Sequence, residues 1–288
     1  MKIQTNEKGF TLVELAIVMA IIGLLIGGIL KGQELMENAR VASTVTQVKA
    51  TEASVTTFRD TFNGIPGDLA RADTRLPGCP GVANSCTSPT AAQVGNGTVG
   101  VANEIVLDQG VDATTPLGTA EGAETTLFWT HLLLADLLGG LTNAAIQDGT
   151  FAGWGDTHPG AKIGGGFTVA HSGGSSAGLA TVIPGRGGPD GDGLDNVPVG
   201  TVLVLRSALG GPLNATAGIQ AVSPLRAAQI DRRIDDGKSA SGTVQGYGLA
   251  TSCFVQGVDG AGNPIAGVYD FNETLKSKDC GLIMQIQG

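Results

Sequence analysis

The chain has 288 residues, enough for one large domain or two small ones, and its 42% hydrophobic residues can form a packed core. The formal net charge is −9, with 17 Lys and Arg against 26 Asp and Glu, which argues against a nucleic-acid-binding protein because such proteins neutralise phosphates with basic side chains. There are three histidines, and no two have the spacing of metal ligands on a helix or hairpin, which argues against a histidine-based metal enzyme.

The N-terminal segment is a polar leader followed by an apolar run. Residues 1–9 contain two lysines, and residues 10–30 are apolar except for Thr11 and Glu14. A helix of that length spans about 30 Å, the thickness of the hydrocarbon core of a bilayer. No small-residue cleavage site of the secretory kind follows, because Lys31 leads directly into more helical sequence. We therefore expect a retained single-pass anchor with a cytoplasmic N-terminus.

Glu14 is the one charged residue inside this apolar run, and two interpretations of it are open. The string from Thr11 to Glu14 fits the Ser/Thr-x-x-Glu pattern of a capping box, in which both residues cap the start of a helix. Alternatively, a carboxylate inside a membrane span is costly and marks a functional contact.

The residues around Glu14 read Lys8-Gly9-Phe10-Thr11-Leu12-Val13-Glu14-Leu15 and precede the long apolar run. This string resembles the processing site of type IV prepilins and the related pseudopilins. The resemblance implies that a membrane prepilin peptidase cleaves between Gly9 and Phe10 and methylates the new amino group of Phe10. It also implies that Glu14 of one subunit neutralises the Phe10 amino group of a neighbour and so sets the register of assembly, since each buried charge needs the other.

The same resemblance implies where the protein lies and what it contacts. The precursor is expected in the inner membrane, and the mature chain in an extracellular filament or a periplasmic pseudopilus. Its expected partners are identical subunits in a helical filament, the peptidase/N-methylase, an inner-membrane assembly platform and the membrane. No nucleic acid is expected, and no cofactor is required.

Four glycines in and just after the apolar run have two interpretations. Gly23, Gly27, Gly28 and Gly32 form overlapping Gly-x-x-x-Gly spacings, which permit close approach of neighbouring helices. Alternatively, glycine is simply common in this chain, which has 46 of them. Because glycine lowers helix propensity, this stretch could also melt locally when subunits leave the lipid.

Beyond residue 30 the helical pattern continues with apolar residues on one side only. That stripe consists of Val41, Val45, Val48, Val55, Phe58 and Phe62. Asn63 and Gly64 offer a left-handed C-cap and Pro66 a helix breaker, which predicts a helix from Phe10 to Phe62. The domains predicted are therefore a leader at 1–9, a helix at 10–62 whose part 10–30 is the membrane or filament-core segment, and a globular head at 63–288.

The head is predicted to be α+β, with an antiparallel β-sheet and long loops packed on the long helix. The predicted strands are Lys162–Ala170, Thr201–Arg206, Thr243–Leu249 and Gly281–Ile286. One helix is predicted over Glu124–Leu138, and a second begins at Pro224, with Ser223 as its N-cap.

Short pieces of the head also resemble one large subgroup of prepilin-like proteins. These pieces are Ile65-Pro66-Gly67-Asp68, Phe128-Trp129-Thr130-His131-Leu132, Ser223-Pro224, Ile230-Asp231 and Asp235-Asp236-Gly237-Lys238 followed by a cysteine pair. The usual Leu-Pro-Gly-Asp of that subgroup has Ile65 here.

Four cysteines in an exported domain predict two disulfides. Three pairings exist in principle, and chain order favours Cys79 with Cys86 and Cys253 with Cys280. A zinc site is the alternative, but no Cys-x-x-Cys spacing is present.

Two acidic, glycine-containing loops stand out. Asp190, Asp192 and Asp195 lie in a loop whose first positions resemble a calcium loop, although Thr201 occupies the position of the closing Glu. A calcium site and an ordinary solvated turn are both open there. The string Asp235-Asp236-Gly237 predicts a tight turn, because Asp-Gly favours positive φ angles.

No enzymatic motif survives in this sequence. Residues 174–178 match the Gly-x-Ser-x-Gly of hydrolases, but no histidine follows His171, so a triad in the hydrolase order is impossible. The expected function is a structural subunit of a type IV pilus or a pilus-like filament. The alternatives are a minor pilin or pseudopilin of a type II secretion system, or a membrane-anchored adhesin, which the large region between residues 80 and 220 keeps open.

Overall fold

A computed structural model describes residues 11–77, 79, 86, 95–99, 123–142, 153–172, 198–209, 218–248, 250–261 and 263–286. Four of the expectations above fall outside these residues: the 1–9 leader with Gly9, Phe10 of the processing site, the loop of Asp190, Asp192 and Asp195, and the 174–178 string. The chain divides into two compact units, one ending at Arg40 and the other beginning at Val41.

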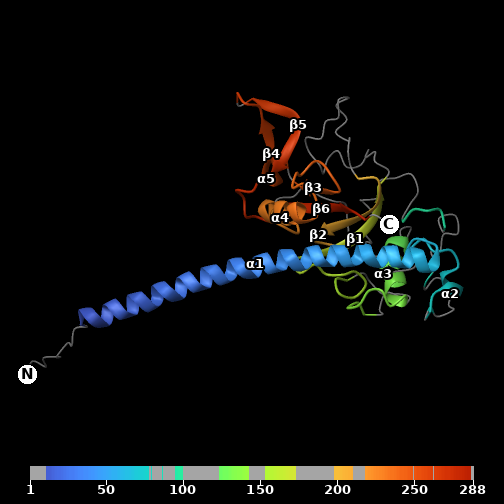
Figure 1. Cartoon of the computed structure of the whole chain (residues 1–288), viewed down its shortest axis with the longest axis horizontal. Helices are drawn as coiled ribbons and strands as arrows, with labels where there is room; N and C mark the ends of the chain where they lie inside the picture. Colours follow the sequence, from blue (N-terminus) through green and yellow to red (C-terminus); the bar gives the residue numbers. More distant parts are fainter. Residues whose placement is uncertain are drawn as a thin grey trace, which may run out of the picture. The chain divides into compact units, whose positions relative to one another are not determined.

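The first element, α1 (Leu12–Phe62), is a helix of 51 residues (Figure 1). Among the described residues it differs from the predicted helix only at Thr11, which precedes it. It is the one helix in the described ranges that is long and apolar enough to cross a membrane, by length and composition. Its end also follows the prediction. Asn63 adopts a left-handed backbone with φ 46°, and its N–H donates to the Arg59 carbonyl at 2.8 Å.

The C-terminal half of α1 forms one wall of the core of the head. Its buried residues are Val41, Thr44, Val45, Val48, Thr51, Val55 and Phe58. They recur every three or four positions and so lie on one face of the helix. The predicted apolar stripe is confirmed, and Thr44 and Thr51 fill two positions on the same face that a hydrophobic pattern does not reveal.

The head contains an antiparallel sheet of four strands in the order β1-β2-β6-β3 (Figure 1). The strands are β1 (Gly166–Ser172), β2 (Gly200–Arg206), β3 (Val244–Gly248) and β6 (Cys280–Gln285). All four were predicted to within about two residues except at the start of β1. Residues 162–165 form a turn instead, because Gly164 and Gly165 have φ of 132° and 66° and cannot continue an extended strand.

A second, two-stranded antiparallel sheet was not predicted. It pairs β4 (Phe254–Val258) with β5 (Pro264–Phe271), and the register is irregular between Gln256 and Val258. Two short helices, α2 (Ala72–Arg75) and α5 (Ala250–Cys253), were also missed.

The helix α3 (Ala123–Leu134) is shorter than the sequence suggests. It ends four residues before Leu138, because Asp136 adopts a left-handed backbone with φ 57°. The N–H of Leu137 then donates to the Leu132 carbonyl at 3.0 Å, and the N–H of Asp136 donates to Leu133 at 3.0 Å. An aspartate thus takes the place usually filled by glycine in a Schellman cap.

The helix α4 (Pro224–Ile234) begins at the predicted proline. Ser223 has the extended backbone of an N-cap and its carbonyl accepts the N–H groups of Arg226 and Ala227, both at 2.9 Å. Its side chain makes no capping hydrogen bond, so the cap consists of the backbone and the proline alone. Ala227, Ala228 and Ile230 of α4 join the same core cluster as the sheet residues Leu203, Leu205 and Leu282.

Candidate functional site

The start of α1 is closed by the predicted capping box. The Glu14 Oε2 atom accepts the backbone N–H of Thr11 at 2.9 Å and its hydroxyl at 2.8 Å. In return, the N–H of Glu14 donates to Thr11 Oγ1 at 3.3 Å. Both contacts to the carboxylate use Oε2, so within the described ranges Oε1 remains for another partner. Phe10 lies outside the described residues, and the pairing of Glu14 with a neighbour's amino group stays a prediction.

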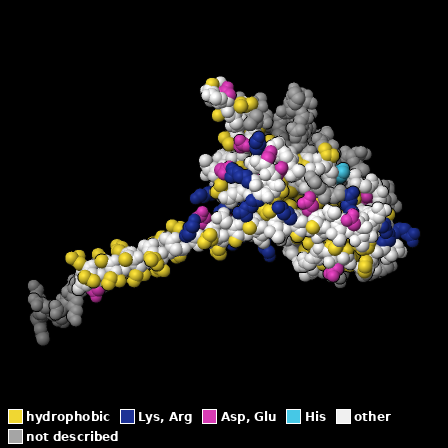
Figure 2. All heavy atoms as spheres, viewed as in Figure 1, with side chains coloured by type: hydrophobic (Ala, Val, Ile, Leu, Met, Phe, Trp, Pro, Cys, Tyr) yellow, Lys and Arg dark blue, Asp and Glu magenta, His cyan; other side chains and the backbone are white. Residues whose placement is uncertain are grey.

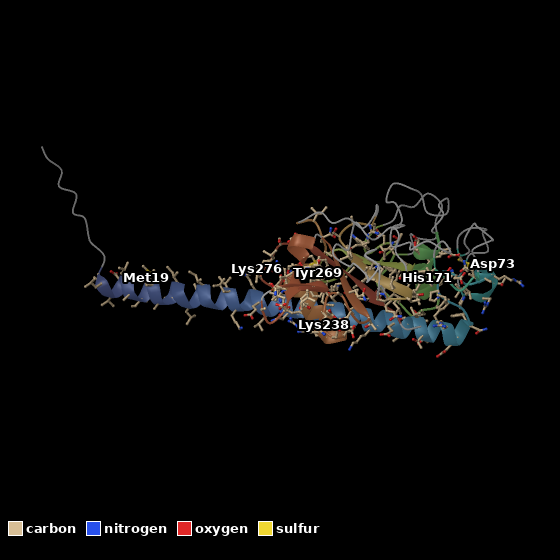
Figure 3. All side chains as sticks on the ribbon, turned by 90° about the horizontal axis from the view of Figure 1, so that it is seen from above. Met19, Asp73, His171, Lys238, Tyr269 and Lys276 are labelled. Carbon is tan, nitrogen blue, oxygen red and sulfur yellow. A yellow bond between two sulfur atoms is a disulfide. The ribbon has the colours of Figure 1, made fainter. Side chains whose placement is uncertain are left out.

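The N-terminal part of α1 exposes a continuous apolar surface. Leu12, Leu24 and Leu30 are 87%, 77% and 63% exposed, and the large apolar residues between them are at least 44% exposed. Figure 2 shows these side chains along the helix, and Figure 3 shows Met19 pointing away from its axis. A protein surrounded by water does not leave such a surface uncovered, so this segment requires a bilayer or other helices around it.

The four glycines of this region leave the helix backbone open. A Cβ atom added to Gly23, Gly27, Gly28 or Gly32 would meet no other atom within 4 Å. The backbone is therefore accessible to a neighbouring helix at each of these positions, but no such neighbour is part of this structure, and helix packing there stays a prediction.

In the head, two of the short motifs lie in contact although 64 residues separate them. The N–H of Gly67 donates to Nδ1 of His131 at 2.9 Å, and Nε2 of His131 donates to the Cys86 carbonyl at 2.7 Å. His131 is fully buried, and burial lowers its pKa to about 4. The ring is therefore neutral, and it joins the turn after α1 to α3 and to the Cys79–Cys86 loop. Phe58 of α1 stacks on this ring with centroids 6.1 Å apart.

The carboxylate next to this turn organises a second loop. Asp68 is buried, and its Oδ1 accepts the N–H of Asn96 at 3.1 Å and that of Gly95, while its Oδ2 accepts the N–H of Gly97 at 2.7 Å. Burial raises the pKa of Asp68 above its ordinary value, and the three N–H groups act in the opposite direction. Asp68 therefore has a structural role, holding residues 95–97 against the turn.

Two disulfides close the head. They join Cys79 to Cys86 and Cys253 to Cys280, the pairs that chain order favours, and no cysteine is free. The second one links α5 to the first residue of β6. At Asp235-Asp236-Gly237, where a tight turn was predicted, the chain bends after α4 and Gly237 has the expected positive φ, 80°.

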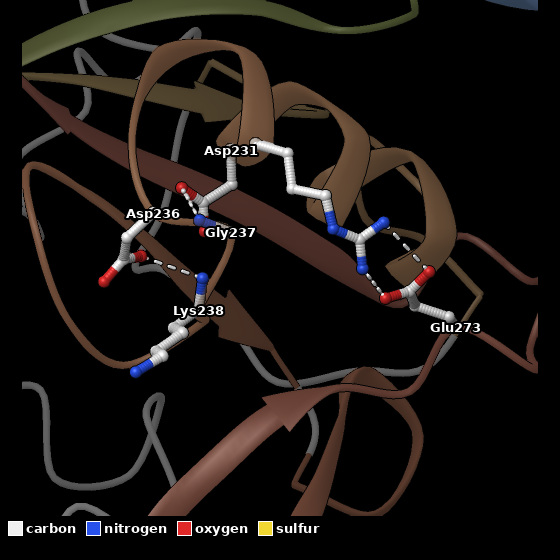
Figure 4. A network of polar contacts seen from close by, with 6 residues as sticks. Asp231, Asp236, Gly237, Lys238 and Glu273 are labelled. Atoms are coloured by element: carbon white, nitrogen blue, oxygen red, sulfur yellow. Dashed lines mark hydrogen bonds and ion pairs between the residues drawn. The ribbon is translucent and has the colours of Figure 1, made fainter.

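This turn brings together three carboxylates. One oxygen from each of Asp231, Asp235 and Asp236 lies within 4.8 Å of the others. Figure 4 draws two of the three, Asp231 and Asp236. Among the described residues this is the one cluster of His, Cys, Asp or Glu that could hold a metal ion. The calcium site considered from the sequence, at Asp190, Asp192 and Asp195, lies outside the described residues. From the sequence, Asp231 stood out only as part of the Ile230-Asp231 string.

A family model decides the nature of the N-terminal segment. The model of the prokaryotic N-terminal methylation motif matches residues 4–30. The chain carries the prepilin-type signal of type IV pilins and pseudopilins. The match spans residues 4–9 of the predicted leader, the predicted processing site and the exposed apolar part of α1 as far as Leu30. No curated protein and no solved structure matches the chain.

The residues of the signal could be predicted from the sequence, whereas the contacts within the head could not. The link from Gly67 through His131 to Cys86 spans separations of 64 and 45 residues. The resemblance of residues 65–68 and 128–132 to one subgroup was the available signal, since two motifs that occur together in one family are candidates for contact.

Proposed function

We propose that this chain is a structural subunit of a type IV pilus or a pilus-like extracellular filament, and not an enzyme. The observation that carries the proposal is the prepilin-type signal at residues 4–30, followed by an exposed apolar helix. On this proposal the peptidase removes residues 1–9 and methylates Phe10. The mature chain leaves the membrane when its apolar helix transfers from lipid into a bundle of identical helices.

Burial of the apolar surface in the bundle supplies most of the cohesion. Relative to water, each square ångström of buried apolar surface stabilises the bundle by about 25 cal/mol. Relative to lipid, the bundle is stabilised by the close packing of its helices instead. The open backbone at Gly23, Gly27, Gly28 and Gly32 supports close approach of the helices.

Glu14 supports the second part of the proposal, the register. Its Oε2 caps its own helix and its Oε1 stays available, so one carboxylate serves both as the cap and as the partner of a neighbour's Phe10 amino group. The two interpretations of Glu14 are therefore compatible. In an apolar bundle an unpaired amino group or carboxylate costs several kcal/mol, which makes the pairing selective for one stagger.

Processing is tested by the intact mass and N-terminal sequence of the mature protein from a host with a prepilin peptidase. We expect a chain that begins at N-methylated Phe10. A chain that retains Met1 in such a host refutes the proposal. Gly9→Ser and Gly9→Leu are expected to leave the precursor uncleaved and in the membrane.

The register is tested by Glu14→Ala with Glu34→Ala as the matched control. Glu34 lies exposed on the same helix and forms a surface ion pair with Lys31 at 2.7 Å, so its loss removes the same charge without the proposed contact. We expect Glu14→Ala to reach the membrane and be cleaved but to yield few or short filaments, while Glu34→Ala yields normal ones. Normal filaments from both variants would exclude the role in register.

The same preparations separate a major subunit from the alternatives. A major pilin is the bulk protein of purified extracellular filaments, as seen by electron microscopy and by protein staining. A minor subunit or an adhesin is scarce there, and a type II pseudopilin stays in the periplasm and its loss blocks secretion.

A further inference from the structure

The end of α4 and the turn that follows it form a compact site of carboxylates. Asp231 lies in the last turn of α4, Asp235 is its C-cap, and Asp236 belongs to the tight turn. Their carboxylate oxygens lie within 4.8 Å of one another, so three negative charges share a space of the size of one hydrated ion. Like charges this close disfavour simultaneous ionisation unless a cation lies among them.

Asp231 is the residue that points to a ligand. Its side chain is fully buried, with 0% exposure. Its Oδ1 accepts the N–H of Gly237 at 3.3 Å, but its Oδ2 has no hydrogen-bond partner. Figure 4 shows the Asp231 carboxylate directed at the turn that carries Asp236 and Gly237. A buried carboxylate oxygen with no donor is costly, so either a proton or a metal ion is required there.

The neighbouring cations do not supply that charge directly. Arg232 pairs with Glu273, with one contact at 3.2 Å. Lys238 donates its backbone N–H to Asp236 Oδ1 at 2.9 Å, and its side chain in Figure 4 points away from Asp231. Both side chains influence the carboxylates only by longer-range electrostatic attraction, Arg232 that of Asp231 and Lys238 that of Asp236.

The other two carboxylates are fixed in place by the polypeptide. Oδ2 of Asp235 accepts the N–H groups of Thr243 and of Val244, the latter at 3.3 Å. Oδ2 of Asp236 accepts the Ser241 hydroxyl at 2.6 Å. These contacts hold the carboxylates of Asp235 and Asp236 in place beside that of Asp231.

We propose that Asp231, Asp235 and Asp236 bind one calcium ion. All the protein donors are carboxylate oxygens, which suits a hard cation and not zinc or copper. The arrangement is irregular and three carboxylates leave further positions to water, which calcium accepts with six to eight ligands and which magnesium, with its strict octahedral demand, accepts less well. A site of this kind in an extracellular module binds calcium with a Kd of about 10⁻⁴–10⁻³ M.

The ion would connect α4 to the edge strand β3. Asp231 and Asp235 belong to α4 and its cap, while the loop they hold leads through Thr243 to Val244, the first residue of β3. Bound calcium therefore stabilises the α4–β3 connection after the chain has reached a compartment with millimolar calcium. Calcium binding itself concerns the head alone, and only the compartment that supplies the calcium rests on the proposed function.

The test is calcium titration of the full chain in a nonionic detergent, by calorimetry and by thermal unfolding. At 10 mM CaCl₂, against the same protein in a chelator, we expect the unfolding midpoint to rise by about 3–10 °C. Asp231→Asn is expected to weaken calcium binding at least tenfold and to lose that rise. The matched control is Asp270→Asn, which removes one exposed carboxylate from β5 and is expected to retain the wild-type response.

Asp231→Asn could impair folding because Asp231 is buried, so Asp236→Asn serves as a second variant at an exposed position. Asp236→Asn is also expected to weaken calcium binding. An equal loss of response in Asp270→Asn would overturn the site, because the effect would then be general charge screening. No response of the wild-type protein at 10 mM calcium, or an equal response to 10 mM MgCl₂, would also overturn the assignment.

Discussion

Gly67 is the residue at which a single methyl group tests the packing of the head most directly. Gly67 has φ 90°, a conformation in which any Cβ is strained, and its N–H bonds to His131. An added Cβ would overlap the Glu124 carbonyl oxygen and lie 3.2 Å from the Phe128 nitrogen, both of them backbone atoms of α3. Helix backbone cannot move aside as the end of a long side chain can, so the turn and α3 must separate.

The expected cost of Gly67→Ala has two parts. The positive φ contributes about 1–2 kcal/mol, and overpacking against backbone contributes about 1–3 kcal/mol. The sum is about 2–5 kcal/mol, a large part of the 5–15 kcal/mol that stabilises a typical domain. The matched control is Gly97→Ala, where φ is 86° but an added Cβ meets nothing within 4 Å. That variant is expected to lose about 1–2 kcal/mol from backbone strain alone.

The assay is urea unfolding of the full chain in detergent, followed by the fluorescence of its two tryptophans, Trp154 and the buried Trp129. The difference between the two variants isolates the contact between the turn and α3. If Gly67→Ala and Gly97→Ala lose the same free energy of unfolding, the close packing of Gly67 on α3 is refuted.

Two further predictions concern the covalent and ionic features of the head. Replacing both Cys253 and Cys280 by Ser is expected to lower the free energy of unfolding by about 3–4 kcal/mol, because that disulfide joins residues separated by 27 positions. The same change at Cys79 and Cys86, which are separated by 7 positions, is expected to lower it by about 2–3 kcal/mol. Equal losses in urea unfolding would contradict this order. Burial first, and then the two neighbouring carboxylates, raise the pKa of Asp231 to about 7. Without calcium, the unfolded chain releases the Asp231 proton near pH 4 and the folded chain releases it near pH 7. The folded state therefore gains its full stabilisation from the protonated Asp231 below about pH 4 and loses it as the pH rises to 7. The wild-type protein should therefore lose stability relative to Asp231→Asn between pH 4 and 7 in chelator, and a constant difference across that range would show that Asp231 titrates normally.

The sequence predicted the elements whose determinants are local. The end of α1 follows from Asn63 and the proline after it, and the start of α4 follows from Pro224. The buried stripe from Val41 to Phe58 follows from spacing alone. The prepilin-type signal was equally readable, since the basic residue, the glycine, the phenylalanine and the glutamate stand in one continuous string.

The features that the sequence did not predict depend on contacts between distant residues. β4 has buried and exposed residues without alternation, since Phe254 is buried while Val255 and Gln256 are both exposed, so no period of two marks it as a strand. His131 lies within the helix predicted over Glu124–Leu138, but its bonds to Gly67 and Cys86 exist only once three segments have met. The burial of Asp231 could not be predicted either. Arg232 and Arg233 beside it make this end of the helix look polar and exposed in the sequence.

The position of β6 determines when the head can fold. β6 lies between β2 and β3 in the sheet, and its Cys280 bonds to Cys253, yet it is the last strand of the chain. During synthesis the N-terminus emerges first, so α1, β1 and β2 are available long before residues 280–285. The four-stranded sheet can therefore form only after β6 has been synthesised. Until then the apolar strands β2 and β3 lack the strand that pairs with both of them. A stall or a truncation shortly before Cys280 would remove β6 and one disulfide together, so residues 280–285 decide whether the four-stranded sheet can close.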